Sequence, residues 1–199
     1  MNIVKVLVEG YAHANEDGTY TASPTCTLVE SNGKKFLVDP GTNSEKLTEA
    51  LKRENIEEKD LSFIYLSHYH PDHWLNTRLF PNLDIYDGEI CWIGEQETFH
   101  QGKLPGVDVE IIKTPGHATE NTSLIIKTDD GVICVGSDVF WWEDGKQKSD
   151  RMDDLLNLED PFANDKEALL ISRKLVLEKA DFIIPGHGKM FKTPPSVDL

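Results

Sequence analysis

The chain contains 199 residues, of which 39% are hydrophobic and 28% are charged, and its formal net charge is −15. This composition excludes a disordered chain, and no apolar run approaches the roughly 20 residues that a membrane-spanning helix needs. The negative charge disfavours a nucleic acid as partner, without excluding one, because phosphate backbones are repelled. We therefore expect a single domain over residues 1–199 that contacts no membrane.

The first part of the chain is predicted to consist mainly of strands. Its start alternates apolar and polar positions and lacks the basic head of a signal peptide, so a cytoplasmic location is expected. The dipeptide Asn32-Gly33 is typical of a hairpin turn. Thr42 and Glu45 resemble a capping box and predict the start of a helix there. The predicted strands are residues 2–10, 25–31, 34–41 and 62–67.

The second part combines strands with one long helix. A short helical piece is expected over about 74–80, and Asn164 with Glu167 predicts the start of a helix over residues 165–180. Asp130-Gly131 predicts the turn of a second hairpin. Strands mixed with helices indicate a layered α/β or α+β domain. The predicted strands are residues 83–88, 89–94, 108–116, 122–138 and 181–188.

The segment "HYHPDH" places three histidines and one aspartate within residues 68–73. Crowded imidazoles gain nothing from their proximity unless a cation lies among them. His68 and His70 can face one metal ion, while Asp72 and His73 can turn toward a second, and zinc suits such nitrogen and oxygen ligands. Each ion would then have two ligands from this segment, so further ligands must come from other parts of the chain.

Three single residues can supply them: His117 in "TPGH", Asp138 in "VGSD" and His187 in "PGHG". Each follows an apolar strand, as the histidine segment does, and residues at strand ends can converge on one edge of a sheet. The Pro-Gly pair before each histidine predicts a tight turn that presents the imidazole. An ionised Asp138 after a buried strand would be costly without a cation, and a carboxylate can bridge two metals.

These motifs, in this order, resemble the metallo-β-lactamase superfamily. The match extends over nearly the whole chain and consists of "VDPG", "SHYHPDH", "TPGH", "GSD" and "PGHG". The resemblance implies a four-layer αββα sandwich of mostly antiparallel sheets, with two metal ions at one edge. The stretches "VLVEGYA", "LFPNLDIY" and "SDVFWWEDG" are most similar to the small hydrolases that resemble metallo-β-lactamase domain-containing protein 1.

The resemblance also implies roles for individual residues. A hydroxide held between two metal ions would attack the substrate, since bound cations lower the pKa of water from about 15.7 toward 7. Asp72 and Asp138 would anchor and orient it. The ions are expected to be Zn²⁺, with iron or manganese as alternatives. His68, His70 and His117 would hold the first ion, Asp72, His73 and His187 the second, and Asp138 would lie between them.

Further candidates lie around this predicted site. Asp39 either orients a ligating histidine or is a turn aspartate that bonds its own backbone before Pro40-Gly41. Trp74 and Trp141 either line a substrate pocket or pack at the base of a loop. Tyr69, between two ligands, is expected to project toward the pocket mouth or the packed surface. Asn121 is a candidate for polarising a substrate carbonyl.

The leading hypothesis is therefore a metal-dependent hydrolase of a small ester, thioester, lactone or phosphodiester. The alternatives are a ribonuclease or phosphodiesterase similar to the RNA-processing members, a mononuclear-iron sulfur dioxygenase that would use His68, His117 and Asp138, and a non-catalytic metal-binding module. A homodimer is left open. Three cysteines that are far apart and odd in number argue against a disulfide framework, and Cys134 is expected to be a buried thiol.

Overall fold

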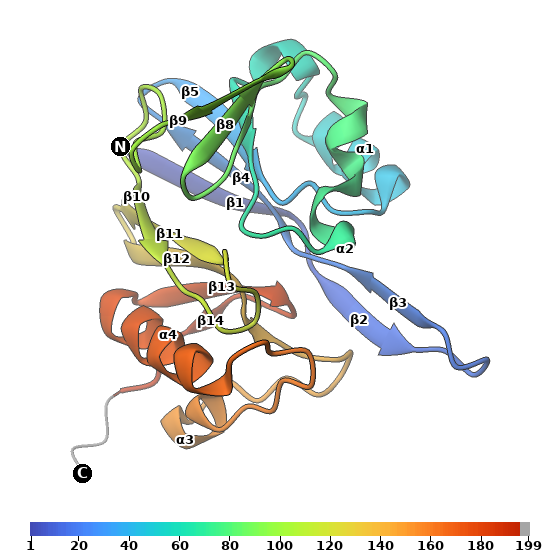
Figure 1. The fold of residues 1–199 in the computed structure, drawn as a ribbon, viewed down its shortest axis with the longest axis vertical. Coiled ribbons are helices and arrows are strands. Elements are labelled where there is room, and N and C mark those ends of the chain that lie inside the picture. Colours follow the sequence, from blue (N-terminus) through green and yellow to red (C-terminus); the bar gives the residue numbers. More distant parts are fainter. Residues whose placement is uncertain (196–199) are drawn as a thin grey trace.

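The computed structural model describes residues 1–195 and contains two β-sheets that lie face to face between helices (Figure 1). The seven strands of the first sheet are, in spatial order, β1 (Asn2–Val8), β4 (Cys26–Ser31), β5 (Lys34–Val38), β6 (Phe63–Tyr65), β7 (Ile85–Tyr86), β8 (Ile90–Ile93) and β9 (Gln96–Phe99). The second sheet contains β10 (Glu110–Lys113), β11 (Thr122–Thr128), β12 (Gly131–Trp141), β13 (Phe182–His187) and β14 (Phe191–Lys192). Neighbours are antiparallel except for the parallel pairs β5–β6, β6–β7 and β12–β13.

Alternating side chains on the strands build three hydrophobic cores. In β5, Phe36 and Val38 point into the core between the two sheets, whereas Leu37 points to the opposite face, as the two-residue period of a strand requires. In β12, Val135 faces the same central core and Cys134 faces away from it. Because both faces of these strands are covered, the chain forms a four-layer sandwich, and this confirms the predicted αββα architecture.

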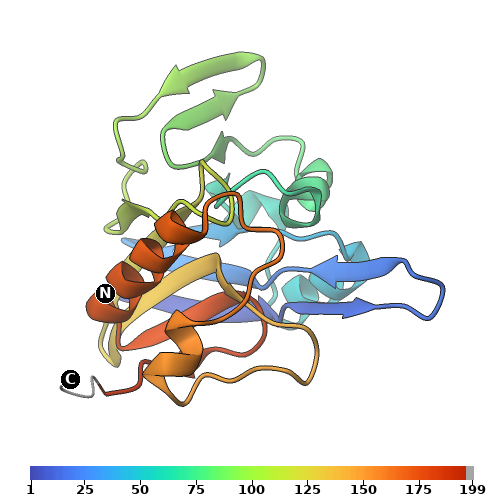
Figure 2. The ribbon, with the colours of Figure 1, turned by 60° about the horizontal axis from the view of Figure 1, so that its bottom comes forward.

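Helices cover the two outer faces. Helix α1 (Ser44–Arg53) packs Leu47 and Leu51 on the first sheet. Helix α4 (Lys166–Lys179), the orange-to-red helix of Figure 2, packs Leu169 and Val176 on the second. The remaining helical pieces are η1 (Glu58–Asp60), α2 (Pro71–Trp74), η2 (Leu75–Leu79) and α3 (Met152–Leu156).

The two predicted helix starts are each wrong by one residue. The residue that caps α1 is Asn43, whose side chain accepts from Lys46 N, and not Thr42. The residue that caps α4 is Asp165, which accepts from two backbone N–H groups, and not Asn164. Neighbouring polar residues can all cap a helix, so the choice depends on where the preceding loop places the backbone.

The first predicted hairpin turn is confirmed, and the second is displaced. Ser31 pairs with Lys34, and both Asn32 and Gly33 have positive φ angles, as a two-residue turn of this type requires. In the later hairpin Thr128 pairs with Gly131, so the loop is residues 129–130 and Gly131 already belongs to the strand.

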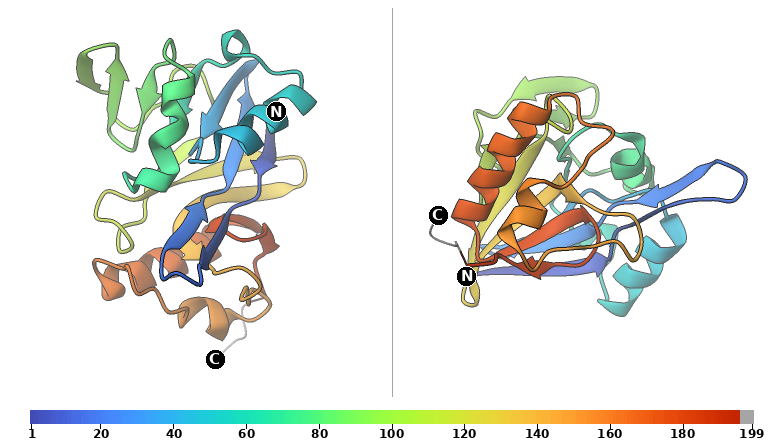
Figure 3. Two further views of the ribbon diagram at one scale, coloured as in Figure 1. Left: turned by 90° about the vertical axis from the view of Figure 1, so that its right-hand side faces the viewer. Right: turned by 90° about the horizontal axis from the view of Figure 1, so that it is seen from below.

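A two-stranded ribbon was not predicted. It consists of β2 (Tyr11–Ala14) and β3 (Tyr20–Ser23), and it projects from the body of the molecule in Figures 1 and 3. Strands β9 and β14 and helix α3 were not predicted either, because such short segments carry little periodic signal. Of the helices between residues 1 and 195, none combines the length and the apolar character that crossing a bilayer requires. Cys26, Cys91 and Cys134 are buried free thiols.

Candidate metal centre

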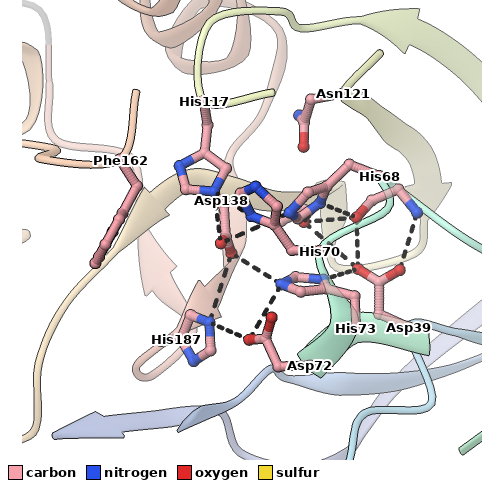
Figure 4. Close-up of polar contacts among 12 residues, drawn as sticks. Asp39, His68, His70, Asp72, His73, His117, Asn121, Asp138, Phe162 and His187 are labelled. Atoms are coloured by element: carbon pink, nitrogen blue, oxygen red, sulfur yellow. Dashed lines mark hydrogen bonds and ion pairs between the residues drawn. The ribbon is translucent and has the colours of Figure 1, made fainter. Parts of the chain in front are cut away.

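The seven predicted ligands come from distant parts of the chain and converge at one edge of the sandwich (Figure 4). Four of them follow β6 of the first sheet, in the loop and short helix α2. The other three belong to the second sheet: His117 lies in the loop after β10, Asp138 within β12, and His187 at the end of β13. Both sheets therefore contribute to the same site.

The first set consists of His68, His70, His117 and Asp138, whose ligand atoms all lie within 4.8 Å of one another. The Nε2 atom of His117 is 2.9 Å from His70 Nδ1 and 3.2 Å from Asp138 Oδ2. The Nε2 atom of His68 is 3.9 Å from the same Asp138 oxygen. Three imidazole nitrogens and one carboxylate oxygen therefore face a common point.

The second set consists of Asp72, His73 and His187, again within 4.8 Å. The Nε2 atom of His187 is 3.3 Å from Asp72 Oδ2, and that of His73 is 3.8 Å from the same oxygen. Asp138 Oδ1 lies 3.4 Å from His73 Nε2 and 3.8 Å from His187 Nε2. Each oxygen of Asp138 thus faces one set, which is the geometry of a bridging carboxylate.

Four of the five imidazoles are held through Nδ1, and this leaves Nε2 directed at the centre. Holding the second ring nitrogen fixes the tautomer and orientation of a ligating histidine. The holding atoms are Ser67 Oγ for His68 (3.0 Å), Asp39 Oδ2 for His73 (2.9 Å), Asp160 Oδ2 for His117 (2.7 Å) and the Tyr11 carbonyl for His187 (3.0 Å).

Asp39 is the centre of a buried hydrogen-bond network. Its Oδ1 accepts a hydrogen bond from Ser67 N at 2.9 Å, and its Oδ2 accepts one from Ser67 Oγ at 2.7 Å. The same Oδ2 atom lies 2.9 Å from His73 Nδ1. Ser137 Oγ is 2.7 Å from Ser67 Oγ. The carboxylate thus reaches across the fold to the histidine segment, and the alternative interpretation as a local turn aspartate is wrong.

The site has an excess of buried polar groups that a cation would satisfy. Burial would lower the pKa of His73, but the carboxylates of Asp138 and Asp39 outweigh it and raise that pKa well above its usual value. Burial would likewise raise the pKa of Asp138, but His73 and His187 hold it well below its ordinary range. For His68, burial and the neighbouring His73 both lower the pKa. These directions favour the carboxylate form of Asp138, the charged form of His73 and the uncharged imidazole of His68.

Three ligand atoms have no hydrogen-bond partner within the described residues: His68 Nε2, His73 Nε2 and Asp138 Oδ1. Leaving a buried polar group unsatisfied costs about 1–3 kcal/mol, so a ligand that contacts these three atoms together would stabilise the fold. Divalent transition metals prefer this mixture of imidazole and carboxylate donors. The residues present therefore fit a pair of divalent cations.

A pocket of about 560 Å³ opens above the ligands. Trp141, one of the predicted pocket residues, lines it. Tyr69 and Asn121 instead line a neighbouring pocket of about 260 Å³ on the far side of His68. The Tyr69 hydroxyl bonds Asp87, and the Asn121 amide donates to Thr114 at 3.0 and 3.1 Å. Both side chains therefore have structural partners.

Trp74 lines neither of these two pockets, and its indole N–H donates to the Tyr69 carbonyl at 3.1 Å. The Pro-Gly pair before His187 also differs from its prediction, because it lies within β13 and not in a turn. Gly186 is needed there for space, since a Cβ atom would lie 1.7 Å from Asp138 Oδ1. Only the pair before His117 forms a turn, with φ +132° at Gly116.

Several residues of the site were missed from the sequence. Asp160, Ser67 and Ser137 hold the ligating histidines or Asp39, and Phe162 and Tyr20 line the pocket. No local signal identifies them, since "LEDPF" resembles an ordinary turn and serines are common throughout the chain. Their roles depend on contacts between segments far apart in the sequence.

Comparisons with known proteins agree with this geometry. A family model described as "Metallo-beta-lactamase superfamily" matches residues 20–103. The chain is 29% identical over 199 residues to "Metallo-beta-lactamase domain-containing protein 1" of Xenopus laevis, covering 95% of this chain and 81% of that protein. It is 31% identical over 175 residues to the protein of the same name from Homo sapiens, covering 83% of this chain and 62% of the human protein.

A solved structure shows the same fold. A Thermotoga maritima protein assigned to the metallo-beta-lactamases superimposes with a TM-score of 0.67 over 96% of this chain and 99% of its own, at 18% identity. The agreement extends over both sheets, and not only over the segment that the family model matches.

Proposed function

Because this chain belongs to the metallo-β-lactamase superfamily, we propose that it is a metal-dependent hydrolase whose substrate is a small ester, thioester or lactone. The observation that carries the proposal is the division of the ligands into two sets on either side of Asp138. His68, His70 and His117 would hold one ion, Asp72, His73 and His187 the other, and Asp138 would contact both.

Hydrolysis adds water across the acyl bond: a C–O bond forms, the bond to the leaving group breaks, and a water proton passes to the leaving group. When bound, two divalent cations would lower the pKa of water and polarise the scissile carbonyl. His73 and His187 hold the pKa of Asp138 well below its ordinary range, which favours the carboxylate form that accepts hydrogen bonds. Asp72 lines the pocket with its side chain 26% exposed, so we assign it the task of orienting the attacking water.

The lining of the pocket favours an uncharged substrate over a phosphodiester. Apart from the proposed ligands, the pocket is lined by Thr42 and by apolar or aromatic residues, and no lysine or arginine is among its lining residues. Nucleic acid substrates need cationic groups for their flanking phosphates, and the chain has a net charge of −15. This supports an acyl substrate and disfavours a nuclease.

The ligand arrangement also disfavours a mononuclear-iron dioxygenase. Such an enzyme would use His68, His117 and Asp138 alone, and the second set would then have no function. Zinc is our choice of metal because five imidazoles and two carboxylates are borderline donors that suit it. A reducing cytoplasm as location is consistent with the three buried free thiols.

Metal analysis combined with a substrate panel tests this proposal. Protein purified without added metal should contain two zinc ions per chain and hydrolyse p-nitrophenyl esters, thioesters or lactones in preference to bis-p-nitrophenyl phosphate and RNA. Asp138→Ala and His68→Ala should lose metal and lower kcat/KM by about a thousandfold or more. The matched control is His100→Ala, because His100 lies outside the site and its Nε2 atom bonds the Asp87 carbonyl.

A single tightly held iron with oxygen uptake would overturn the proposal in favour of the oxidoreductase. Cleavage of RNA by the wild type that Asp138→Ala abolishes, without ester hydrolysis, would overturn it in favour of the nuclease. Full activity in Asp138→Ala or in His68→Ala would show that the active site lies elsewhere.

A further inference from the structure

A buried carboxylate outside both ligand sets links the metal centre to the substrate pocket. Asp160, in the loop between α3 and α4, is only 4% exposed. Its Oδ2 is 2.7 Å from His117 Nδ1, and its Oδ1 accepts from Phe162 N at 2.9 Å. The two oxygens of one side chain therefore contact a proposed metal ligand and a residue of the pocket wall.

The contact with His117 determines which ring nitrogen carries the proton. A carboxylate accepts hydrogen bonds only, so His117 must donate from Nδ1, and Nε2 is left with its lone pair. That Nε2 atom is the one that lies 3.2 Å from Asp138 Oδ2 and 2.9 Å from His70 Nδ1. Asp160 thus presents His117 in the tautomer that a metal ion requires.

The loop that contains Asp160 is fixed at several points. Asn164 N donates to the His117 carbonyl at 3.2 Å, and Asp165 N donates to the Gly116 carbonyl at 2.9 Å. The buried guanidinium of Arg173 donates to the Leu158 carbonyl at 2.5 Å and to the Val139 carbonyl of β12 at 3.1 Å. These bonds hold the loop against the segment that bears His117 and, through Arg173, against the strand that bears Asp138.

Phe162 is the part of this loop that reaches the pocket. Its ring lies 5.7 Å from the ring of Trp141 and 6.4 Å from that of Tyr20, centroid to centroid, and all three residues line the pocket. Figure 4 shows Phe162 on the side of the cluster where His117 and His187 lie. The Phe162 residue is nevertheless 56% exposed, so much of its ring is free to contact a ligand.

We propose that Asp160 is a positioning residue that orients His117 for metal binding and fixes Phe162, and that Phe162 selects substrates with an apolar acyl group. The part that concerns Phe162 rests on the proposed hydrolase function. The part that concerns Asp160 depends only on metal binding and is tested without any substrate.

The decisive variant is Asp160→Asn, which keeps the size and shape of the side chain. The asparagine oxygen can still accept from Phe162 N, but its NH2 group then faces Nδ1 of His117 and favours the wrong tautomer. We expect one of the two zinc ions to bind about 10–100-fold more weakly, measured by competition with a chromogenic chelator. Asp165→Asn is the matched control: it makes the same chemical change in the same loop at a helix N-cap, where asparagine serves equally well, and should leave zinc affinity unchanged.

A double-mutant cycle shows whether the effect passes through His117. In a His117→Ala background, Asp160→Asn should change zinc affinity by less than about threefold, because the group it orients is absent. Long-range ¹⁵N NMR spectra of the zinc-loaded wild type should place the His117 imidazole proton on Nδ1. A proton on Nε2, or an unchanged zinc affinity in Asp160→Asn, would overturn the positioning role, and the NMR result needs no variant to fold.

Phe162→Ala tests the specificity. Its zinc affinity should equal that of the wild type, whereas the ratio of kcat/KM for p-nitrophenyl hexanoate over p-nitrophenyl acetate should fall about tenfold, equivalent to roughly two methylene groups of lost apolar contact. Phe99→Ala on β9, which is outside the pocket, is the control. An unchanged ratio would overturn the role of Phe162. A zinc-loaded wild type that hydrolyses no ester would overturn the proposed function, while the zinc measurements would still decide the role of Asp160.

Discussion

Replacing Asp39 tests how much of the stability of the site lies in its supporting hydrogen bonds. Asp39 is 2% exposed, and its carboxylate accepts from Ser67 N and is held against His73 Nδ1. Asp39→Ala leaves these two buried donors without an acceptor, at about 1–3 kcal/mol each. Asp39 also has a φ of +49°, where alanine is about 1 kcal/mol less favourable than aspartate. We expect Asp39→Ala to lower the free energy of unfolding by about 3–7 kcal/mol.

Asp39→Asn should have an intermediate effect. Whichever way the amide turns, its oxygen satisfies one donor and its NH2 group meets the other, so about 1–3 kcal/mol should be lost. Both variants should also bind zinc about 10–100-fold more weakly, because His73 is no longer held in its ligating orientation.

Urea unfolding in the presence of a chelator measures the first effect without a contribution from metal, and zinc competition measures the second. Asp150→Ala, which removes an exposed carboxylate, is the control and should stay within about 0.5 kcal/mol of the wild type. A loss below about 1 kcal/mol in Asp39→Ala would refute the reasoning, because it would mean that the two donors find other partners.

Three further outcomes are expected. Gly186→Ala should abolish binding of at least one metal ion in elemental analysis, because its Cβ would lie 1.7 Å from Asp138 Oδ1. The control Gly136→Ala, whose Cβ would have its nearest contact at 3.5 Å, should keep both ions. Removing both metal ions with EDTA should lower the Tm by about 16–33 °C in differential scanning fluorimetry, relative to protein at a zinc concentration 1,000 times the Kd of each site, and an unchanged Tm would contradict the proposed ligands. Gly33→Ala should cost about 1 kcal/mol in urea unfolding with no change in zinc content, because φ is +76° in a turn far from the site.

The convergence of the candidate ligands could be predicted from the sequence because each lies beside a strong strand signal. Residues at strand ends can converge on one edge of a sheet, so the motif around His68 and the single residues His117 and His187 were expected to converge, and the structure brings them together from two sheets. Asp39 could be proposed as a supporting residue only through the resemblance, since its position before Pro40 has an equally good local explanation.

The substrate side of the site could not be predicted in the same way. Tyr20 reaches the pocket on a two-stranded ribbon, and Phe162 reaches it on a loop, and neither segment has a periodic pattern. Asp160 depends on a contact 43 residues away in the chain. Conversely, Tyr69 is next to two candidate ligands in sequence but lines another pocket, where its hydroxyl bonds Asp87.

The origin of the ligands in both sheets has a mechanical consequence. An ion shared by Asp72, His187 and Asp138 joins the first half of the chain to the second and closes a loop on the order of 100 residues, a closure worth about 4–5 kcal/mol if it were a covalent disulfide. The bound cations would thus act as a reversible cross-link between the two halves of the chain. Metal supply would then govern whether those halves open together or one at a time, independently of any reaction at the site.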